Sequence, residues 1–395
     1  VAFRLPMHTA TRLAVPVIRE VRALAPAARL CCYGLYGPPN EALLRELGVE
    51  HVLGGEFEQA LLEVVSGEGH RCRVASGSAL PRLQFRVPDR EGLPPLKSYA
   101  SVECHSGRRV AGYTEASRGC KHLCRHCPIV PVYAGRFRAI PRDIVLADIR
   151  SQVEAGAEHI TFGDPDFFNG VGHAASVVDA FSREFPGVSY DVTIKVEHLR
   201  RHADELGRLR DTGCLFVVTA VESIDDTVLT RLDKGHTRAD FESVVGRCRS
   251  LGLTLSPTFI PFTPWTTLEG YCELLRALDA LELVECVAPI QLTLRLLIQQ
   301  GSRLLDLGWG GLGAGLAPFD HDQLIHPWRH RDPRVDRLQE AVSSLVERRT
   351  GAPRVVLFDE ILSVAATEAG LVVPARLTQR RPRASVPFLN EPWYC

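Results

Sequence analysis

Three cysteines lie close together between Ser117 and Pro128, in the spacing C-x3-C-x2-C at Cys120, Cys124 and Cys127. A loop with three thiolates is able to bind three irons of a 4Fe–4S cubane and to leave the fourth iron without a protein ligand. The amino and carboxylate groups of S-adenosylmethionine (SAM) chelate such an open iron, which brings the sulfonium beside a low-potential electron donor. The spacing therefore predicts a cluster that breaks a C–S bond of SAM.

Zinc is the alternative metal for the same loop, because His122 or His126 would supply the fourth ligand that zinc prefers. Both histidines lie inside the cysteine loop, where reaching the same ion is cramped. C-x2-C zinc sites also usually come as two separated pairs. The iron–sulfur interpretation is favoured, and a structural zinc or iron–sulfur scaffold without enzyme activity stays open.

Size and composition limit the remaining functions. A chain of 395 residues is longer than the chains that usually fold around one hydrophobic core, so two or three domains are expected. Because 46 basic residues stand against 47 acidic ones, charge gives no case for a nucleic-acid partner. No apolar run approaches a membrane span and no signal peptide is visible, so we expect a cytoplasmic protein without a membrane partner. Twelve cysteines in such a chain favour metal or redox use over disulfides.

The first seventy residues alternate strand and helix patterns. Strands are expected at Val1–Leu5, Arg29–Tyr36 and Glu50–Leu53, each followed by a helical segment that ends by Ser66. This pattern is typical of parallel βαβ units in a doubly wound sheet, and residues 1–70 are the size of half a domain. Because the chain opens within a strand, we expect it to be cut from a longer protein.

Residues 71–110 contain several prolines among charged residues and are predicted to form an irregular linker. A longer α/β alternation follows over residues 111–300 and predicts a partial TIM-type (β/α)6 barrel. Its strands are expected at Ala111–Ala116, His159–Phe162, Val188–Lys195, Leu215–Val221, Thr254–Ile260 and Pro289–Leu297. Residues 301–395 are predicted to form an α-rich region, with a helix at Pro333–Arg349, a short strand at Val355–Phe358 and a helix at Glu360–Glu368.

The cysteine motif, its place after the first barrel strand and the repeated βα units resemble the radical SAM superfamily. The resemblance covers roughly residues 111 to 300. It implies that Asp164 and Asp166, at the end of the second strand, lie where the methionine amino group is held. Glu222 and Ser223 correspond to the segment of the fourth strand that contacts ribose and methionine. The alternative for these residues is a turn or a helix N-cap, which Asp and Ser commonly provide.

Other charged residues follow strands of the predicted barrel. Lys195 and Arg295 are expected to face its interior, and a buried charge needs a partner, so both are candidates for binding the substrate or a carboxylate of the cofactor.

Residues 1–58 resemble the latter half of the cobalamin-binding domain that precedes many radical SAM barrels. A doubly wound sheet offers a ligand crevice at its strand ends, where His8 would approach a corrin. A polar loop histidine is the alternative interpretation. The Asp-x-His-x-x-Gly signature of one class of cobalamin domain is absent, so cobalamin binding stays open.

The chain ends in Asn390-Glu-Pro-Trp-Tyr-Cys395. This ending resembles a bacterial radical SAM group with a CUAEP or CCAEP tail, related in turn to the arsinothricin-biosynthesis radical enzyme. That resemblance implies a catalytic thiol at Cys395 and transfer of a 3-amino-3-carboxypropyl group to a metalloid. A surface cysteine on a frayed end is the alternative.

The expected function is thus a radical SAM enzyme, most simply a transferase, that modifies a small molecule or metalloid. Cobalamin-dependent radical methylation is the enzymatic alternative. An electron donor such as flavodoxin or ferredoxin is the expected protein partner.

Overall fold

The computed structural model describes residues 1–67, 80–312, 315–372 and 386–390. These residues belong to two compact units. The first unit contains residues 1–84, 119–138 and 297–331, and the second contains residues 85–118, 139–296 and 332–395. The cysteine loop therefore belongs to the first unit, and the strands of the predicted barrel belong to the second.

A small parallel sheet organises the start of the first unit. Its strands are β1 (Ala2–Arg4), β2 (Cys31–Tyr33) and β3 (His51–Leu53), in the order β1-β2-β3. The connecting elements are α1 (His8–Leu24), η1 (Pro38–Asn40), α2 (Glu41–Glu46) and α3 (Glu58–Ser66). Leu5, Ile18, Leu30 and Val52 are fully buried between the sheet and its helices. The predicted parallel βαβ pattern is confirmed, because each apolar strand is followed by a helical segment.

The rest of the first unit consists of short elements around the cysteine loop. They are the end of β6 (Ser117–Gly119), α4 (Val130–Tyr133), the start of β7 (Phe137–Ala139), η6 (Arg303–Leu307), α12 (Gly308–Leu312), β12 (Gly315–Leu316) and β13 (Trp328–Arg329). Strands β12 and β13 pair antiparallel, and β6 and β7 form another two-stranded sheet.

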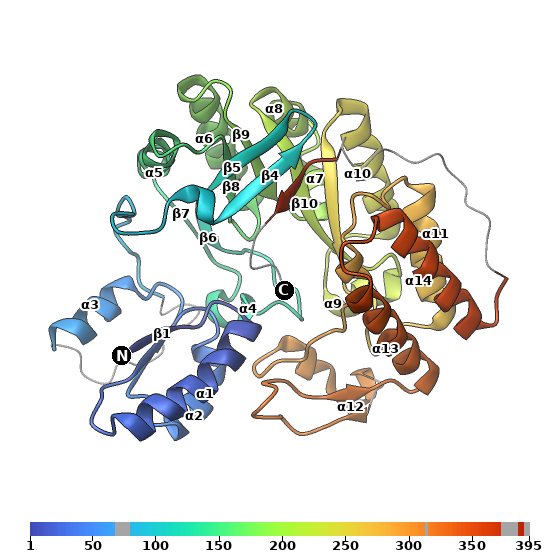
Figure 1. Ribbon diagram of the computed structural model, residues 1–395, viewed down its shortest axis with the longest axis horizontal. Coiled ribbons are helices and arrows are strands. Elements are labelled where there is room, and N and C mark those ends of the chain that lie inside the picture. Colours follow the sequence, from blue (N-terminus) through green and yellow to red (C-terminus); the bar gives the residue numbers. More distant parts are fainter. Residues whose placement is uncertain (68–79, 313–314, 373–385, 391–395) are drawn as a thin grey trace. The chain divides into compact units, whose positions relative to one another are not determined.

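A seven-stranded sheet forms the second unit, in the order β11-β10-β9-β8-β5-β4-β14 (Figure 1). Its parallel strands are β5 (Gly107–Thr114), β8 (His159–Phe162), β9 (Ser189–Thr193), β10 (Cys214–Glu222) and β11 (Thr254–Phe259). Two strands extend the sheet beyond β5: β4 (Ala100–Cys104) pairs antiparallel with β5, and β14 (Phe388–Asn390) pairs antiparallel with β4. The predicted partial barrel is confirmed, with the helices following its strands in βα order.

Helices cover one face of this sheet, and two further helices, α13 (Pro333–Arg348) and α14 (Arg354–Ala369), follow its parallel strands in the sequence (Figure 1). The other longer ones are α5 (Arg142–Glu154), α6 (Val171–Glu184), α10 (Arg238–Leu251) and α11 (Leu268–Ala280). The shorter ones are η3 (Leu96–Ser98), η4 (Phe167–Gly170), α7 (Val196–Arg201), α8 (Glu205–Asp211), α9 (Asp226–Leu232) and η5 (Pro289–Leu292).

Side-chain alternation along β8 separates the two faces of the sheet. Ile160 and Phe162 are buried in the main core against the helices. Thr161 points to the opposite face, because successive side chains of a strand alternate, and there its hydroxyl donates to Asp191 (2.7 Å). This opposite face is the interior of the curled sheet, and it also carries Ala111 and Phe216.

Three predicted elements differ from the structure. The predicted sixth strand is wrong: Pro289 begins a 3-10 helix, and only a single bridge between Phe262 and Arg295 continues the parallel pattern. Proline is favoured at the first position of a helix, which is the position that Pro289 takes here. The predicted strand at Val355–Phe358 is also wrong, because these residues begin α14 and pack against other helices. The predicted irregular linker contains β4, which pairs with β5 as a hairpin.

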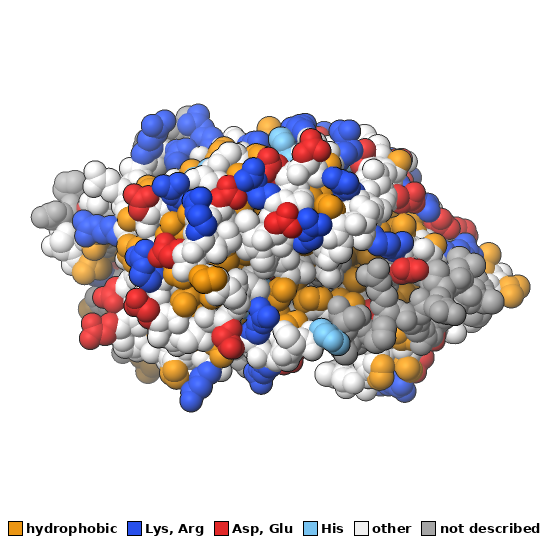
Figure 2. Space-filling model, turned by 90° about the horizontal axis from the view of Figure 1, so that it is seen from above, with side chains coloured by type: hydrophobic (Ala, Val, Ile, Leu, Met, Phe, Trp, Pro, Cys, Tyr) orange, Lys and Arg blue, Asp and Glu red, His pale blue; other side chains and the backbone are white. Residues whose placement is uncertain are grey.

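No helix in the described part of the chain is long and apolar enough to cross a bilayer. On the face seen in Figure 2, basic and acidic side chains are interspersed, and hydrophobic side chains lie between them.

Candidate functional site

The cysteine loop begins at a residue that has to be glycine. Gly119 has φ +73°, and a Cβ there would lie 2.5 Å from the Arg136 carbonyl oxygen and 2.3 Å from the Tyr133 ring. Within the loop, the Cys127 N–H donates to the Cys124 carbonyl (3.2 Å), and the Val130 N–H donates to the Cys127 carbonyl (3.2 Å). These turns and the start of α4 fix the backbone that carries the last two cysteines.

Residues far away in the sequence hold the loop from outside. The Ser302 hydroxyl donates to the Arg125 carbonyl (3.0 Å), and the Arg303 guanidinium donates to the Leu123 carbonyl (2.6 Å). Cys124 is buried, and Cys120 and Cys127 are half-buried. The loop is thus braced through its backbone carbonyls by residues of the same unit. Three thiols in one braced loop match the donor set of a cubane with one open iron.

Several other cysteines of the described chain are buried, among them Cys32, Cys214 and Cys248. Burial raises the pKa of Cys32 and of Cys248 to about 12, and that of Cys214 well above its usual value. A thiol that stays protonated at neutral pH is a poor metal ligand, so these three act as small buried hydrophobes.

The strand ends of the first unit approach the cysteine loop. At the end of β2, the Tyr36 hydroxyl accepts a hydrogen bond from Gln299 (2.9 Å). Burial raises the pKa of Tyr36, and the Cys127 thiol and the His8 backbone are close enough to influence it. The His8 side chain bonds through Nε2 to the Gln323 carbonyl (2.7 Å), and its burial lowers its pKa.

Two glycines at the end of β3 are covered by side chains of the same unit. A Cβ on Gly54 would lie 1.9 Å from Pro38, and one on Gly55 would lie 2.2 Å from Leu80. The close approach that these glycines permit is therefore used for packing. Side chains, and not glycine backbone, line the expected ligand crevice at the end of β3.

In the second unit, Asp164 follows β8 and connects it to the segment that leads into the cysteine loop. Its carboxylate accepts from the Ala116 N–H (2.8 Å) and from the Ser117 hydroxyl (2.6 Å). Burial raises the pKa of Asp164 to about 7, and the two hydrogen bonds oppose this rise. Ser117 precedes Cys120 by only three residues in the sequence, so Asp164 positions the strand that enters the loop.

Asp166 forms a buried pair with a histidine. Its Oδ2 lies 2.7 Å from Nδ1 of His198, which lies in α7 directly after β9, and its Oδ1 accepts from the Phe168 N–H (3.2 Å). The N-cap alternative for Asp166 is therefore observed as well. Its proposed contact with the methionine amino group stays a prediction.

Four charged side chains gather at the ends of β9 and β10. Lys195 pairs with Glu197 (3.2 Å), and Lys234 pairs with Glu222 (3.2 Å). Glu222 has φ +68°, a strained conformation for a residue with a side chain. Such strain is typical of functional sites, and here it coincides with a register shift at the end of β10. The Ser223 hydroxyl accepts from the Asp225 N–H (3.0 Å) and so shapes the turn that follows.

His236 completes this charged group and was missed by the sequence interpretation. It is 6% exposed, and neither ring nitrogen has a hydrogen-bond partner among the described residues. The Lys234 backbone lies near the ring but outside hydrogen-bond geometry. Burial, followed by the charges of Lys234 and Lys195, lowers the pKa of His236 to about 4. The signal in the sequence was a histidine in the Lys-Gly-His-Thr segment just after a strand-end glutamate.

The remaining predicted residues lie elsewhere or outside the described chain. Arg295 pairs with Asp336 of α13 (2.8 Å), so its role in substrate binding stays a prediction. Cys395 lies outside the described residues. The strand that leads to it, β14, is antiparallel to β4 and therefore parallel to β5.

Part of the chain is similar to a known family. Residues 114–278 match the model of the radical SAM superfamily. A curated relative, the tRNA-2-methylthio-N(6)-dimethylallyladenosine synthase of Pelodictyon phaeoclathratiforme, is 28% identical over 48% of this chain and 42% of its own length. The chain thus spans less than half of that relative.

Two solved structures share the fold. The cobalamin-dependent SAM radical enzyme OxsB, with aqua-cobalamin and SAM bound, superposes with a TM-score of 0.63 at 13% identity, over 89% of this chain and 58% of that one. The radical SAM methyltransferase TsrM from Kitasatospora setae, with tryptophan and a SAM analogue, gives a TM-score of 0.56 at 19% identity, over 71% of this chain and 60% of that one.

Proposed function

Since this chain carries a radical SAM domain, whose cofactors are a 4Fe–4S cluster and SAM, we propose that it cleaves SAM reductively to modify a small molecule or a metalloid. The three thiols of Cys120, Cys124 and Cys127 would hold the cluster, which supplies the electron that breaks a C–S bond. An electron donor such as flavodoxin or ferredoxin would reduce it.

The group of Lys195, Glu222, Lys234 and His236 carries this proposal. A SAM molecule brings a carboxylate, an ammonium group and two ribose hydroxyls, and all of these need polar partners when water is excluded. The two lysines offer donors to the carboxylate, and Glu222 offers acceptors to the hydroxyls. His236 is neutral and has two unused ring nitrogens, so a ligand hydroxyl or amine would satisfy a group that the protein leaves unsatisfied.

Asp164 and Asp166 act mainly on the protein itself in this proposal. Asp164 holds the backbone that enters the cysteine loop, and Asp166 orients His198. The contact of either carboxyl group with the methionine amino group is kept as a proposal for the SAM-bound protein.

Cobalamin-dependent methylation is the second candidate. The similarity to OxsB extends over most of the chain, and in the first unit the end of β2 approaches Cys127 through Tyr36. Against this, the glycines at the end of β3 are covered by Pro38 and Leu80, and His8 is bonded to Gln323. Transfer of a 3-amino-3-carboxypropyl group by way of Cys395 stays a prediction from the tail alone. The curated relative named after a tRNA nucleoside aligns over less than half its length, so RNA is not proposed as the substrate.

Product analysis tests the function and separates these outcomes. The anaerobically reconstituted protein is reduced in the presence of SAM, and the adenosine-containing products are identified by mass spectrometry. 5′-Deoxyadenosine supports reductive cleavage, the same product with S-adenosylhomocysteine supports methylation, and 5′-methylthioadenosine supports aminocarboxypropyl transfer. Cys120→Ala should form none of them, whereas the control Cys104→Ala, whose thiol donates to the Gly107 carbonyl in a hairpin turn, should stay active. Intact SAM under all conditions would refute the proposal.

A further inference from the structure

A cavity of about 740 Å³ lies within the second unit, beside the edge of β5. The pairing of β4 with β5 begins at Ala100 and Ala111, so β5 continues beyond the reach of β4. Residues 88–96 cover this part of the edge and form one wall, α5 forms another, and Thr161 and Leu389 belong to the interior face of the sheet. The volume lies within the range of about 300–1,000 Å³ that is typical of small-molecule sites.

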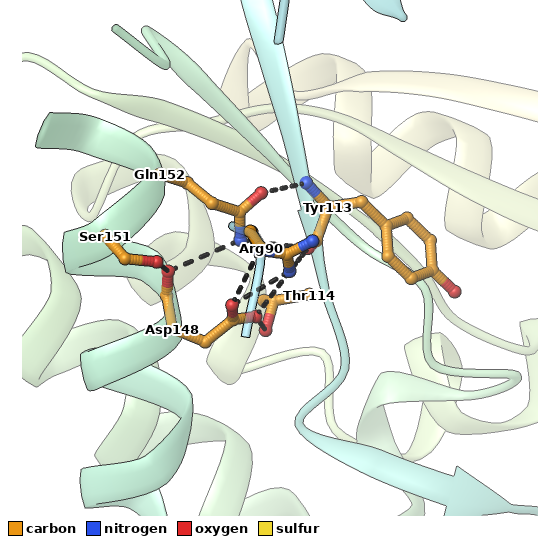
Figure 3. Close-up of polar contacts among 6 residues, drawn as sticks. All are labelled: Arg90, Tyr113, Thr114, Asp148, Ser151 and Gln152. Atoms are coloured by element: carbon orange, nitrogen blue, oxygen red, sulfur yellow. Dashed lines mark hydrogen bonds and ion pairs between the residues drawn. The ribbon is translucent and has the colours of Figure 1, made fainter. Parts of the chain in front are cut away.

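A polar network joins residues of the cavity lining to α5 and β5 (Figure 3). Asp148 of α5 accepts from Arg90 at Oδ1 (2.8 Å) and from the Thr114 hydroxyl at Oδ2 (2.7 Å). Arg90 also donates to the Tyr113 carbonyl (3.0 Å), and Gln152 accepts from the Tyr113 N–H (2.8 Å). The exposed backbone edge of β5 is thus bonded to side chains, so the wall is built before any ligand arrives.

The lining is apolar and offers no free positive charge. Leu93, Pro94, Leu96 and two tyrosine rings provide much of its surface. Among the described lining residues, Arg90 carries the only positive charge, and Asp148 already binds it with both oxygens. A SAM carboxylate would find no partner here, so the cavity is suited to a different molecule. The exposed side chains of Asp89 and Glu91 also belong to the lining, and their negative charges disfavour anions further.

The lining includes Thr161 of β8, close to the strand end that precedes Asp164. Figure 3 shows the Tyr113 ring pointing away from the polar network. A Cβ on Gly163 would lie 1.8 Å from the Tyr113 hydroxyl, so the ring rests directly on the Gly163 backbone. Thr161, two residues earlier in the same strand, lines the cavity itself. A ligand in the cavity would therefore lie next to the carboxyl end of β8.

From the lining, the charge and this position, we propose that the cavity binds the molecule that the enzyme modifies, an uncharged or cationic compound with an aromatic or alkyl body. The identification of the ligand as substrate rests on the proposed function. The binding site itself does not, because it requires only the described side chains of the second unit. An anionic metalloid compound would not fit this site, because the lining offers it no free positive charge.

Two aromatic probes of the same skeleton test the site by fluorescence on the reconstituted protein. N-phenyl-1-naphthylamine is uncharged, and 1-anilinonaphthalene-8-sulfonate carries one negative charge. We expect the uncharged probe to bind at least about tenfold more tightly, which corresponds to about 1.4 kcal/mol. Equal binding of the two probes would overturn the proposed ligand class.

A matched pair of variants places the probe in the cavity. Ser151→Trp puts a large side chain into the lining from an exposed position of α5, and it should weaken binding of the uncharged probe at least about tenfold. Glu154→Trp places the same side chain at an exposed position of the same helix outside the lining, and binding should stay within twofold of the unaltered protein. Binding to Ser151→Trp that equals the control would overturn the proposal.

The separate product analysis distinguishes this proposal from the function on which it partly rests. If the probes and variants behave as predicted but the protein does not cleave SAM, the binding site in the cavity is supported and the proposed function is refuted. SAM cleavage with probe binding that Ser151→Trp leaves unchanged would support the function and refute the cavity.

Discussion

Replacing His236 with phenylalanine should change protein stability and SAM binding in opposite directions. The imidazole is 6% exposed and has two ring nitrogens without a hydrogen-bond partner among the described residues. A buried polar group without a partner costs about 1–3 kcal/mol. Phenylalanine keeps the ring shape and removes this cost, while its slightly larger ring offsets part of the gain. We therefore expect the free energy of unfolding of the SAM-free protein to rise by about 1 kcal/mol.

The same substitution should weaken SAM binding about tenfold, the effect of losing one hydrogen bond of about 1.4 kcal/mol. Urea unfolding followed by circular dichroism gives the stability, and isothermal titration calorimetry under anaerobic conditions gives the SAM affinity. His173→Phe is the matched control, because Nε2 of His173 already bonds to the Ala116 carbonyl (3.2 Å). The control should lose stability. If His236→Phe also lost stability, or bound SAM as tightly as the unaltered protein, the role assigned to His236 would be refuted.

Three further predictions concern the second unit. The folded protein holds the Asp164 proton up to about pH 7, whereas the unfolded chain releases it near pH 4, so stability should fall by up to about 4 kcal/mol as the pH rises between these values. Asp164→Asn should flatten that dependence in urea unfolding at pH 5 and 7.5, and an unchanged slope would contradict the assignment. Asp148→Ala should lower the free energy of unfolding by about 2–4 kcal/mol, because it leaves Thr114 and the partly exposed Arg90 without their acceptor. A loss below 1 kcal/mol in the same assay would count against a rigid cavity wall. Gly163→Ala should weaken binding of the uncharged probe by displacing the Tyr113 ring, and added Tyr113→Ala should restore part of it. If Tyr113→Ala restores none of the lost probe binding, the Tyr113 ring does not border the ligand.

Elements with a strong local pattern were predictable from the sequence. His159–Phe162 was predicted with the bounds that β8 has, and the helix predicted from Pro333 differs from α13 by one residue. The strand predicted at Val355–Phe358 was wrong, because apolar and β-branched residues fit a buried helix as well as a strand. Helix packing against α11 and α13 decided the outcome.

The candidate sites also differ in how far the sequence predicts them. The C-x3-C-x2-C spacing and the strand-end residue Glu222 are local signals, and they led to the loop and to the charged group. The cavity was not predictable, because it depends on Arg90 reaching Asp148 across 58 residues and on β14 joining β4 from the end of the chain. No local pattern encodes such contacts, since they arise only when the sheet has formed.

The reduced-state EPR spectrum of the anaerobically reconstituted protein, recorded with and without SAM, tests the central claim most directly. If the loop of Cys120, Cys124 and Cys127 holds a 4Fe–4S cluster with an iron open to SAM, the reduced cluster gives a signal that changes when SAM is added. Cys120→Ala should lose that signal, and Cys104→Ala should keep it. A signal that SAM leaves unchanged, or a protein that binds zinc in place of iron, would contradict the account.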